Sequence, residues 1–334
     1  MSVQAVLSGH TERVWQAAWH PTRLEIASGG GDRAVRVWRQ GRDGQWACVW
    51  HEAAAHKRTV RAVAWGSTAD GAVLTTAGFD GATAVWEADG DDASLACVAT
   101  LEGHENEVKA VAWAAGGTLV ATCARDKSVW VWESLDDGDF ECVAVLHEHT
   151  QDVKGLAWHP ARDDVLVSAS YDDSIKVWRD RAGDWYCADT LANAHASTVW
   201  AVDFDPSGNL LASVGDDCAL NVWRTDNIDD AFVPFRKVAS LQNAHSRPIY
   251  SVAWSKAHGL IATAGGDNAI RIFKFDHPSN SVALVTEIIN AHGDFDVNCV
   301  RWCPLQESSH LLLSCGDDAN IRIWSFDSQI NNIK

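Results

Sequence analysis

Residues 101–132 read LEGHENEVKAVAWAAGGTLVATCARDKSVWVW, and the order of their polar and apolar positions decides the fold. His104 stands near the start of this stretch, Asp126 follows, and Trp132 comes six residues after the Asp. Between these marks apolar and polar residues alternate, which is the period of a half-buried β-strand. The stretch therefore predicts short strands joined by turns.

The same skeleton recurs seven times along the chain, with 45 to 50 residues between successive His positions. The His positions are His10, His56, His104, His149, His195, His245 and His292, and the Asp positions are Asp32, Asp80, Asp126, Asp172, Asp217, Asp267 and Asp318. Six residues after each Asp comes an aromatic residue: Trp38, Trp86, Trp132, Trp178, Trp223, Phe273 and Trp324. Four short strands per unit predict antiparallel blades, and seven copies predict an all-β, seven-bladed propeller.

A hydroxyl residue also lies four positions before each Asp. These spacings resemble the WD40 repeat, and the resemblance covers essentially the whole chain. It implies a hydrogen-bonded set within each blade, made in the third repeat by the side chains of His104, Thr122, Asp126 and Trp132. Phe273 cannot donate a hydrogen bond, so the set of the sixth repeat is expected to be incomplete.

The ring can close only if one blade is shared between the two ends of the chain. Residues 3–8, VQAVLS, precede the first His and have no strand partner of their own. We therefore expect them to form the outer strand of the blade completed by residues 292–326. The prediction is a single propeller over residues 1–327 with a short, frayed tail at 328–334, and surface loops near 225–234 and 275–281.

The bulk composition favours a soluble interaction protein. The 334 residues are 47% apolar, which supports a real core, and carry a net charge of −18, which argues against nucleic acid as a partner. No secretory leader and no run of eighteen apolar residues is seen, so we expect no membrane association. Nine cysteines without a C-x-x-C pair indicate reduced thiols. We expect a cytoplasmic protein that could also enter the nucleus.

The repeated His, hydroxyl and Asp residues could suggest catalytic triads or metal ligands. Their recurrence at one register in every repeat instead predicts a structural role, so no catalytic residue, metal site or cofactor is expected. Cys48, Cys97, Cys142 and Cys187 also share one strand position and are expected to be small buried hydrophobes. Cys299 and Cys303 lie four residues apart on a predicted strand, too far apart to favour a zinc or cluster site.

Function is expected at positions that the repeat leaves free, near the His and Asp marks. The first such position directly precedes each Asp. The second is the second residue of the first strand in each repeat, and the third lies two residues before that one. A basic and aromatic group stands there, in a strongly acidic chain: Arg13, Trp15, Arg61, Lys109, Arg125, Lys154, Tyr171, Trp200 and Tyr250. Arg and aromatic residues often anchor interfaces, so we predict a partner-binding face, although ordinary solvated side chains would be the plainer interpretation. Trp130 stands where polar residues are usual, and either packing under a loop or a lateral contact would explain it.

Residues between the repeat marks carry a closer resemblance. The strings TLEGHENEVKAVAWAAGGTLVATCARDKSVWVWE (100–133), HTQDVKGLAWHP (149–160), SASYDDSIKVW (168–178) and STVWAVDFDPSG (197–208) resemble the WD40 family of cytosolic iron–sulfur cluster assembly proteins. AHKRTVRAVAW (55–65) and IRIFK (270–274) are similar to the same family.

That resemblance implies a docking platform in a targeting complex, which does not itself hold the cluster. Its implied partners are a HEAT-repeat scaffold, a small cluster-assembly partner and the iron–sulfur apoproteins that receive clusters. Arg125 corresponds to a face residue considered important in the family. The alternative is a WD40 substrate receptor or adaptor of another complex, such as a ubiquitin ligase. A catalytic propeller is disfavoured, because no acid/base pair stands outside the repeat.

Overall fold

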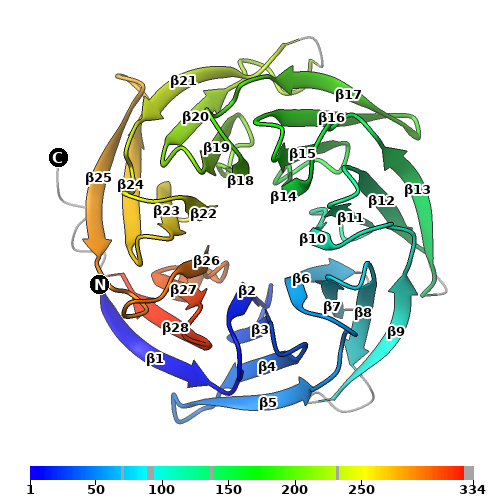
Figure 1. Cartoon of the computed structure of the whole chain (residues 1–334), viewed down its shortest axis with the longest axis vertical. Helices are drawn as coiled ribbons and strands as arrows, with labels where there is room; N and C mark the ends of the chain where they lie inside the picture. The colour runs from blue at the N-terminus through cyan, green and yellow to red at the C-terminus, as the bar shows by residue number, and fades with distance from the viewer. Residues whose placement is uncertain (69–70, 89–93, 136–137, 231–232, 327–334) are drawn as a thin grey trace.

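The computed structural model describes residues 1–68, 71–88, 94–135, 138–230 and 233–326. Seven four-stranded antiparallel sheets stand in a ring, as the repeat predicts (Figure 1). The first strand of each sheet faces the central opening, and the fourth lies at the outer rim. Among the described residues, no helix is long and apolar enough to span a membrane.

The first four blades follow the chain in order. Blade 1 contains β2 (Val14–Trp19), β3 (Glu25–Gly30), β4 (Val35–Gln40) and β5 (Trp46–Glu52). Blade 2 contains β6 (Val60–Thr68), β7 (Gly71–Gly78), β8 (Thr83–Ala88) and β9 (Leu95–Leu101). Blade 3 contains β10 (Val108–Trp113), β11 (Leu119–Ala124), β12 (Val129–Ser134) and β13 (Phe140–Leu146). Blade 4 contains β14 (Val153–Trp158), β15 (Val165–Ser170), β16 (Ile175–Arg181) and β17 (Asp184–Leu191).

The remaining blades complete the ring. Blade 5 contains β18 (Val199–Phe204), β19 (Leu210–Gly215), β20 (Leu220–Arg224) and β21 (Arg236–Leu241). Blade 6 contains β22 (Ile249–Trp254), β23 (Leu260–Gly265), β24 (Ile270–Asp276) and β25 (Ser281–Ile288). Blade 7 contains β26 (Val297–Trp302), β27 (Leu311–Gly316), β28 (Asn320–Ser325) and β1 (Ser2–Ser8), and a short 3₁₀ helix, η1 (Gln306–Ser308), precedes β27.

Closure by the N-terminal strand is confirmed. β1 pairs antiparallel with β28, and Leu7 lies opposite Ile321. Both of these side chains are buried in one apolar cluster with residues of blade 1. The surface loop expected near 275–281 is an exposed turn at 277–280, shorter than expected because β24 and β25 extend to Asp276 and Ser281. The predicted tail at 328–334 lies outside the described residues.

The core lies between neighbouring blades. Val108 and Val120 of blade 3, for example, share an apolar cluster with Val73 of blade 2. Burial of such a side chain stabilises the fold by about 1.5–3 kcal/mol. The second aromatic residue of a repeat can also bond to the blade before it: the indole N–H of Trp158 donates to the Ala112 carbonyl at 3.0 Å. The blades therefore support one another around the ring.

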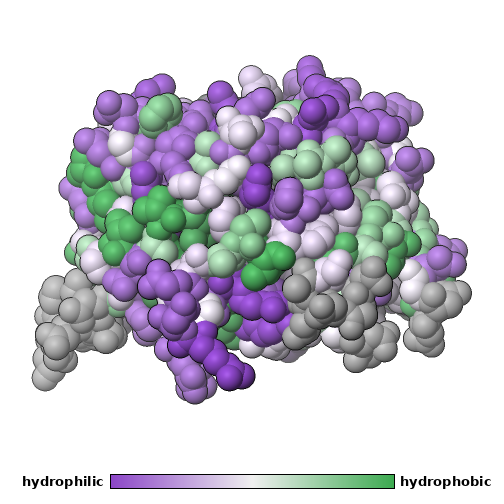
Figure 2. All heavy atoms as spheres, turned by 90° about the horizontal axis from the view of Figure 1, so that it is seen from below, coloured by the Kyte–Doolittle hydropathy of each residue, from purple (hydrophilic) through white to green (hydrophobic). Residues whose placement is uncertain are grey.

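On the side of the ring seen in Figure 2, apolar side chains form small groups between more polar surfaces. Val3 and Val6 of β1 and Val98 of β9 are about half exposed on outer strands. Scattered surface apolar residues of this kind are normal in soluble proteins.

Candidate protein-binding face

The repeated polar residues of blade 3 form one connected network inside the blade. His104 Nδ1 lies 2.8 Å from the Asp126 carboxylate, and His104 Nε2 lies 2.9 Å from the Thr122 hydroxyl. The indole N–H of Trp132 donates to the same hydroxyl at 3.0 Å. Burial alone would raise the pKa of Asp126, but hydrogen bonds from His104 and Ser128 outweigh it and lower that pKa to about 2. Asp126 is therefore a charged acceptor held in place by its donors.

The same His–Asp and His–hydroxyl contacts occur in all seven blades. The indole-to-hydroxyl bond occurs in six of them. In blade 6 the buried ring of Phe273 replaces the indole, and Arg271 instead donates to Asp267 at 2.6 Å. Every His in these sets already bonds through both ring nitrogens, which fits a role in holding the blades together.

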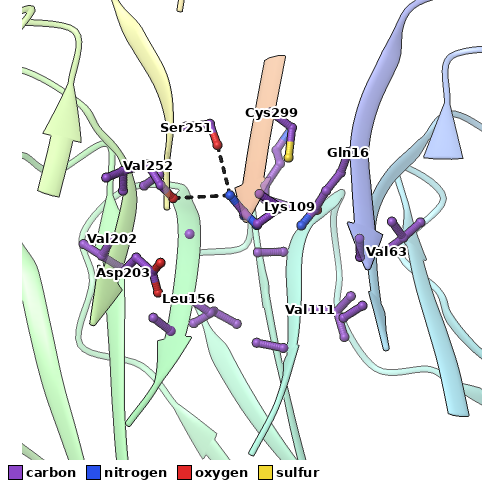
Figure 3. A pocket seen from close by; sticks show the side chains of 18 of the residues that line it. Gln16, Val63, Lys109, Val111, Leu156, Val202, Asp203, Ser251, Val252 and Cys299 are labelled. Carbon is purple, nitrogen blue, oxygen red and sulfur yellow. Dashed lines mark hydrogen bonds between the residues drawn. The ribbon is translucent and has the colours of Figure 1, made fainter. Parts of the chain in front are cut away.

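The candidate face residues gather around the mouth of the central channel. The channel has a cavity volume of about 360 Å³ and is lined by first strands from all seven blades (Figure 3). Six of the predicted side chains line it: Trp15, Arg61, Lys109, Lys154, Trp200 and Tyr250. The other three, Arg13, Arg125 and Tyr171, stand at its rim. Arg13 contacts Trp15, Arg125 lies near Glu107, and Tyr171 contacts Lys154.

Glu107 is the hub of the blade 3 side of the mouth. Its carboxylate lies 2.7 Å from Lys109, 3.0 Å from Arg58 and 3.9 Å from Arg125. Burial alone would raise the pKa of Glu107, but hydrogen bonds from Lys109 and Arg58 lower it. Lys109 also lies 4.2 Å from the centre of the Phe79 ring. Three cations thus face one carboxylate, which leaves an excess of positive charge at this point.

Arg61 adds a further cation to the same side. Its guanidinium lies 5.0 Å from the centre of the Trp15 ring, and no described carboxylate pairs with it. Burial in the channel lowers the pKa of Arg61. Burial also lowers the pKa of Lys109, and the positive charges of Lys154 and Arg61 add to that effect. The cations of blades 2, 3 and 4 are therefore close enough to repel one another.

Lys154 continues the basic side on blade 4. Its ammonium lies 3.2 Å from Asp152 and about equally far from two aromatic rings, 5.3 Å from that of Tyr171 and 5.2 Å from that of Trp200. Tyr171 is 53% exposed. Lys109 and Lys154, by contrast, each keep only 11% of their side-chain surface exposed. Lys109 therefore points into the channel mouth and pairs with Glu107.

The opposite side of the mouth is acidic, so the face is not uniformly basic. The indole N–H of Trp200 donates to Asp216, and the Tyr250 hydroxyl donates to Asp296 at 3.3 Å. Burial and the charge of Asp296 raise the pKa of Tyr250 to about 12. Arg13 lies 3.2 Å from Asp317 on blade 7. The structure thus separates Tyr250, with Asp296, from the basic cluster around Glu107, whereas Arg13 pairs with Asp317 and shares the Trp15 ring with Arg61.

Trp130 packs inside its own blade. Its ring stacks on Trp132 at 5.4 Å between centroids and lies 5.0 Å from the ring of His104. Its indole N–H donates to Ser128 at 2.9 Å, and a Cβ added at Gly103 would come within 2.3 Å of the ring. Of the two explanations for Trp130, the structure supports packing under the loop that carries Gly103.

The cysteine prediction fails at two positions. Cys48 and Cys97 are exposed, whereas Cys142 and Cys187 are half-buried. All four lie on outer strands directly opposite the Trp of the polar set, next to a register shift in the pairing. The shift turns these side chains toward the rim of the blade, so burial does not explain the cysteines at this position. In the described part of the chain, no group of three His, Cys, Asp or Glu side chains could hold a metal ion.

Three residues of the mouth and channel escaped the sequence interpretation. Arg58 has no mark in the repeat, and only the fold brings it to Glu107. Asp203 and Arg301 did carry a signal, because the equivalent position is alanine in the other five repeats: Ala18, Ala64, Ala112, Ala157 and Ala253. Asp203 and Arg301 both line the channel and bond to β22, Asp203 through the N–H of Trp254 and Arg301 through the Ser251 hydroxyl.

Comparison with known proteins agrees with this geometry. The model of the WD domain, G-beta repeat family matches residues 1–39, 95–133, 140–179, 185–224, 235–274 and 284–325. The chain is also 36% identical to the probable cytosolic iron–sulfur protein assembly protein CIAO1 homolog of Schistosoma japonicum, over 97% of both proteins. The chain belongs to the CIAO1 family of WD40 proteins. The corresponding member of this family from Caenorhabditis elegans is 39% identical over 95% of each chain.

Two further relatives of this CIAO1-family chain are longer proteins. The probable cytosolic Fe-S cluster assembly factor of Schizosaccharomyces pombe is 38% identical over 96% of this chain and 53% of its own length. Its counterpart in Schizosaccharomyces japonicus is 40% identical over 69% of this chain and 36% of its own length. This chain therefore spans about half, or less, of those two relatives.

Proposed function

We propose that this protein is a docking platform in the assembly of cytosolic iron–sulfur proteins. Its relatives are named for that process. A HEAT-repeat scaffold, a small cluster-assembly protein and client apoproteins are the partners that we propose, with the cytoplasm as the main site of action and the nucleus as a second one. Iron–sulfur clusters are the cargo of this process and are not resident in the propeller.

A binding role is favoured over a catalytic one. The His, hydroxyl and Asp groups that could resemble a triad are the same in every blade and are occupied by one another. A catalytic site would be expected to stand out as one constellation with a distinct geometry. The channel mouth stands out instead by its charges and aromatic rings, which are features of interfaces.

The observation that carries the proposal is the surroundings of Glu107. This carboxylate already accepts contacts from Arg58, Lys109 and Arg125, and Arg61 stands nearby without a described carboxylate partner. The side chain of Arg125 is 55% exposed, so it can turn toward an incoming group at little cost. We infer that this side of the mouth binds acidic or carboxylate-bearing segments of partner proteins. Arg can hold a carboxylate through two parallel hydrogen bonds, and Tyr171 can cover the contact.

The proposal can be tested by affinity purification of the tagged protein from a cytosolic extract, followed by mass spectrometry. Arg125→Glu should reduce recovery of iron–sulfur apoproteins at least about tenfold, since an unpaired like charge at an interface costs several kcal/mol. Arg42→Glu is the matched control: Arg42 is exposed in the β4–β5 turn, at the end of the strands far from the mouth, and the net-charge change is identical. Equal recovery by folded Arg125→Glu and wild-type protein would contradict the proposed role of this face. Recovery of cullin components without iron–sulfur proteins would support the ubiquitin-ligase alternative.

A further inference from the structure

Cys299 and Cys315 form a thiol pair in the wall of the central channel. They lie directly opposite each other in the antiparallel pairing of β26 and β27. Side chains at such positions point to the same face of the sheet, with Cβ atoms about 4.5–5.5 Å apart. A disulfide tolerates Cα–Cα separations of about 4.4–6.8 Å. Directly opposed residues of an antiparallel ladder fall within this range, whether or not they form a hydrogen-bonded pair. Both residues are free thiols in this structure.

One member of the pair can be reached by a small molecule. Cys299 lines the channel cavity together with Ser251 (Figure 3). Arg301 also lines it, Cys299 is 2% exposed, and Cys315 is fully buried. The Arg301 guanidinium is fixed beside the thiol by the Ser251 hydroxyl at 3.0 Å and the Val252 carbonyl at 3.3 Å. A solute that enters the channel therefore comes to Cys299 before Cys315, and the Cys299 thiol donates to the Ala17 carbonyl at 3.7 Å.

The two thiols have different environments. A hydrogen bond from Cys315, the positive charge of Arg301 and a hydrogen bond from Ser251 lower the pKa of Cys299. Burial, the hydrogen bond to Cys299 and the charge of Cys299 raise the pKa of Cys315. The thiolate is the reactive form of a cysteine. Cys299 is therefore the nucleophile of the pair. Cys315 lies where its sulfur can attack an oxidised Cys299 sulfur and form a disulfide.

Cys123 supplies a built-in comparison. It occupies in blade 3 the position that Cys315 occupies in blade 7, but its partner across the ladder is Ala110. Burial strongly raises the pKa of Cys123. Blade 2 carries alanine at both positions of the pair, Ala62 opposite Ala77, so packing in a blade does not require two thiols.

We propose that Cys299 and Cys315 are an oxidation site, at which a small peroxide entering the channel converts the two thiols into a disulfide. The Cys299 thiolate attacks one peroxide oxygen, the O–O bond breaks, and Cys299 becomes a sulfenic acid while the other oxygen leaves and is protonated to water. The Cys315 sulfur then attacks the Cys299 sulfur, the S–O bond breaks, and a second water leaves. Two thiols lose two electrons in total, and hydrogen peroxide is reduced to two waters. This site is independent of the proposed partner-binding face.

The experiment uses the full chain, reduced and freed of reductant, with hydrogen peroxide as the probe. Aliquots are quenched with an alkylating reagent in denaturant and digested, and each cysteine is followed by mass spectrometry. We expect a peptide pair linked through Cys299 and Cys315, formed at least about tenfold faster than any oxidation of Cys123, because thiolate character sets the rate. A bulky aromatic disulfide reagent should label exposed Cys48 and Cys97 and spare Cys299.

Matched variants identify the route. Cys299→Ala should leave Cys315 as unreactive as Cys123, and Cys123→Ala should leave formation of the linked peptide unchanged. Because the linked peptide is measured in the wild-type chain, the test does not depend on the folding of either variant. If Cys299 and Cys315 oxidise no faster than Cys123, or accumulate separate sulfinic acids without a link, the proposal is wrong.

Discussion

Blades 3 and 6 are built on the same repeat but differ in two sets of residues: the polar network inside the blade and the side chains at the channel mouth. Their first two strands pair with the same register, and each has a His, a Thr and an Asp in contact. Blade 3 completes its network with Trp132, whereas blade 6 has Phe273. At the channel mouth, blade 3 presents Lys109 and Arg125. Blade 6 presents only Tyr250 and Gly266 at the same positions.

The comparison shows that the internal polar network and the residues at the channel mouth vary independently. Blade 6 forms a complete four-stranded sheet although its network has one donor fewer. Phe273 remains fully buried, and Arg271 pairs with Asp267 just as Arg322 pairs with Asp318 in blade 7, which keeps its indole bond. The residues at the channel mouth take no part in this network, so they are free to specify a partner. Four measurements would test this separation.

Removal of the central hydroxyl should cost more in blade 3 than in blade 6. Thr122→Val leaves His104 and Trp132 without their shared partner, whereas Thr263→Val leaves only His245. Each buried group left unpaired costs about 1–3 kcal/mol, so we expect losses of about 2–6 and about 1–3 kcal/mol in the free energy of unfolding. Urea unfolding followed by circular dichroism measures both. Equal losses would show that the indole bond contributes nothing.

Exchange of the aromatic residue should give a smaller effect. Trp132→Phe removes one hydrogen bond and should cost about 0.5–1.5 kcal/mol. The reverse change, Phe273→Trp, should fail to stabilise blade 6, because extra volume in a packed core typically costs about 1–3 kcal/mol. Thermal melts of the two variants against wild type are sufficient. A raised melting temperature for Phe273→Trp would mean that blade 6 has kept room for an indole.

Mild acid should lower stability through blades 6 and 7 before the carboxylates are affected. Burial lowers the pKa of His245 and of His292, in spite of the opposing carboxylates of Asp267 and Asp318. The unfolded chain therefore binds more protons once the pH falls below about 6.5, and stability decreases as pH falls through that range. Asp126, with its pKa lowered to about 2, keeps its contribution until the pH is below its ordinary value of 3.8. Melting temperatures should fall between pH 7.5 and 5.0 at constant salt, and a constant value would contradict this assignment.

Changes at the channel mouth should leave stability almost untouched. Arg125→Gln removes an exposed cation that lies 3.9 Å from Glu107, so the free energy of unfolding should change by less than about 0.5 kcal/mol. Tyr250→Phe in blade 6 is the matched change, since it removes one hydroxyl at the mouth. Partner recovery should fall for Arg125→Gln and persist for Tyr250→Phe. Loss of stability in step with loss of binding would mean that the internal polar network and the channel mouth are coupled.

Much of the fold could be predicted because each repeat states its period and its polar marks independently. The pairing of β1 with β28 followed from counting strands. The exposure of Cys48 could not be predicted, because a register shift in the pairing of β4 with β5 changes which face a side chain occupies. Glu107 and Lys109 were placed on one strand face by their spacing of two. Spacing alone does not tell whether such side chains bond to each other or remain free to bind a partner protein.

The N-terminal strand has a consequence for the order of folding. Ser8 and Asn320 bond to each other although they are 312 residues apart in the chain. The last blade therefore lacks its outer strand until the final repeat has been synthesised, while the first residues must stay available throughout. Joining ends so far apart adds little entropic cost, because that cost grows only with the logarithm of the loop length. The ring can thus close only when its first strand pairs with β28 of the last repeat.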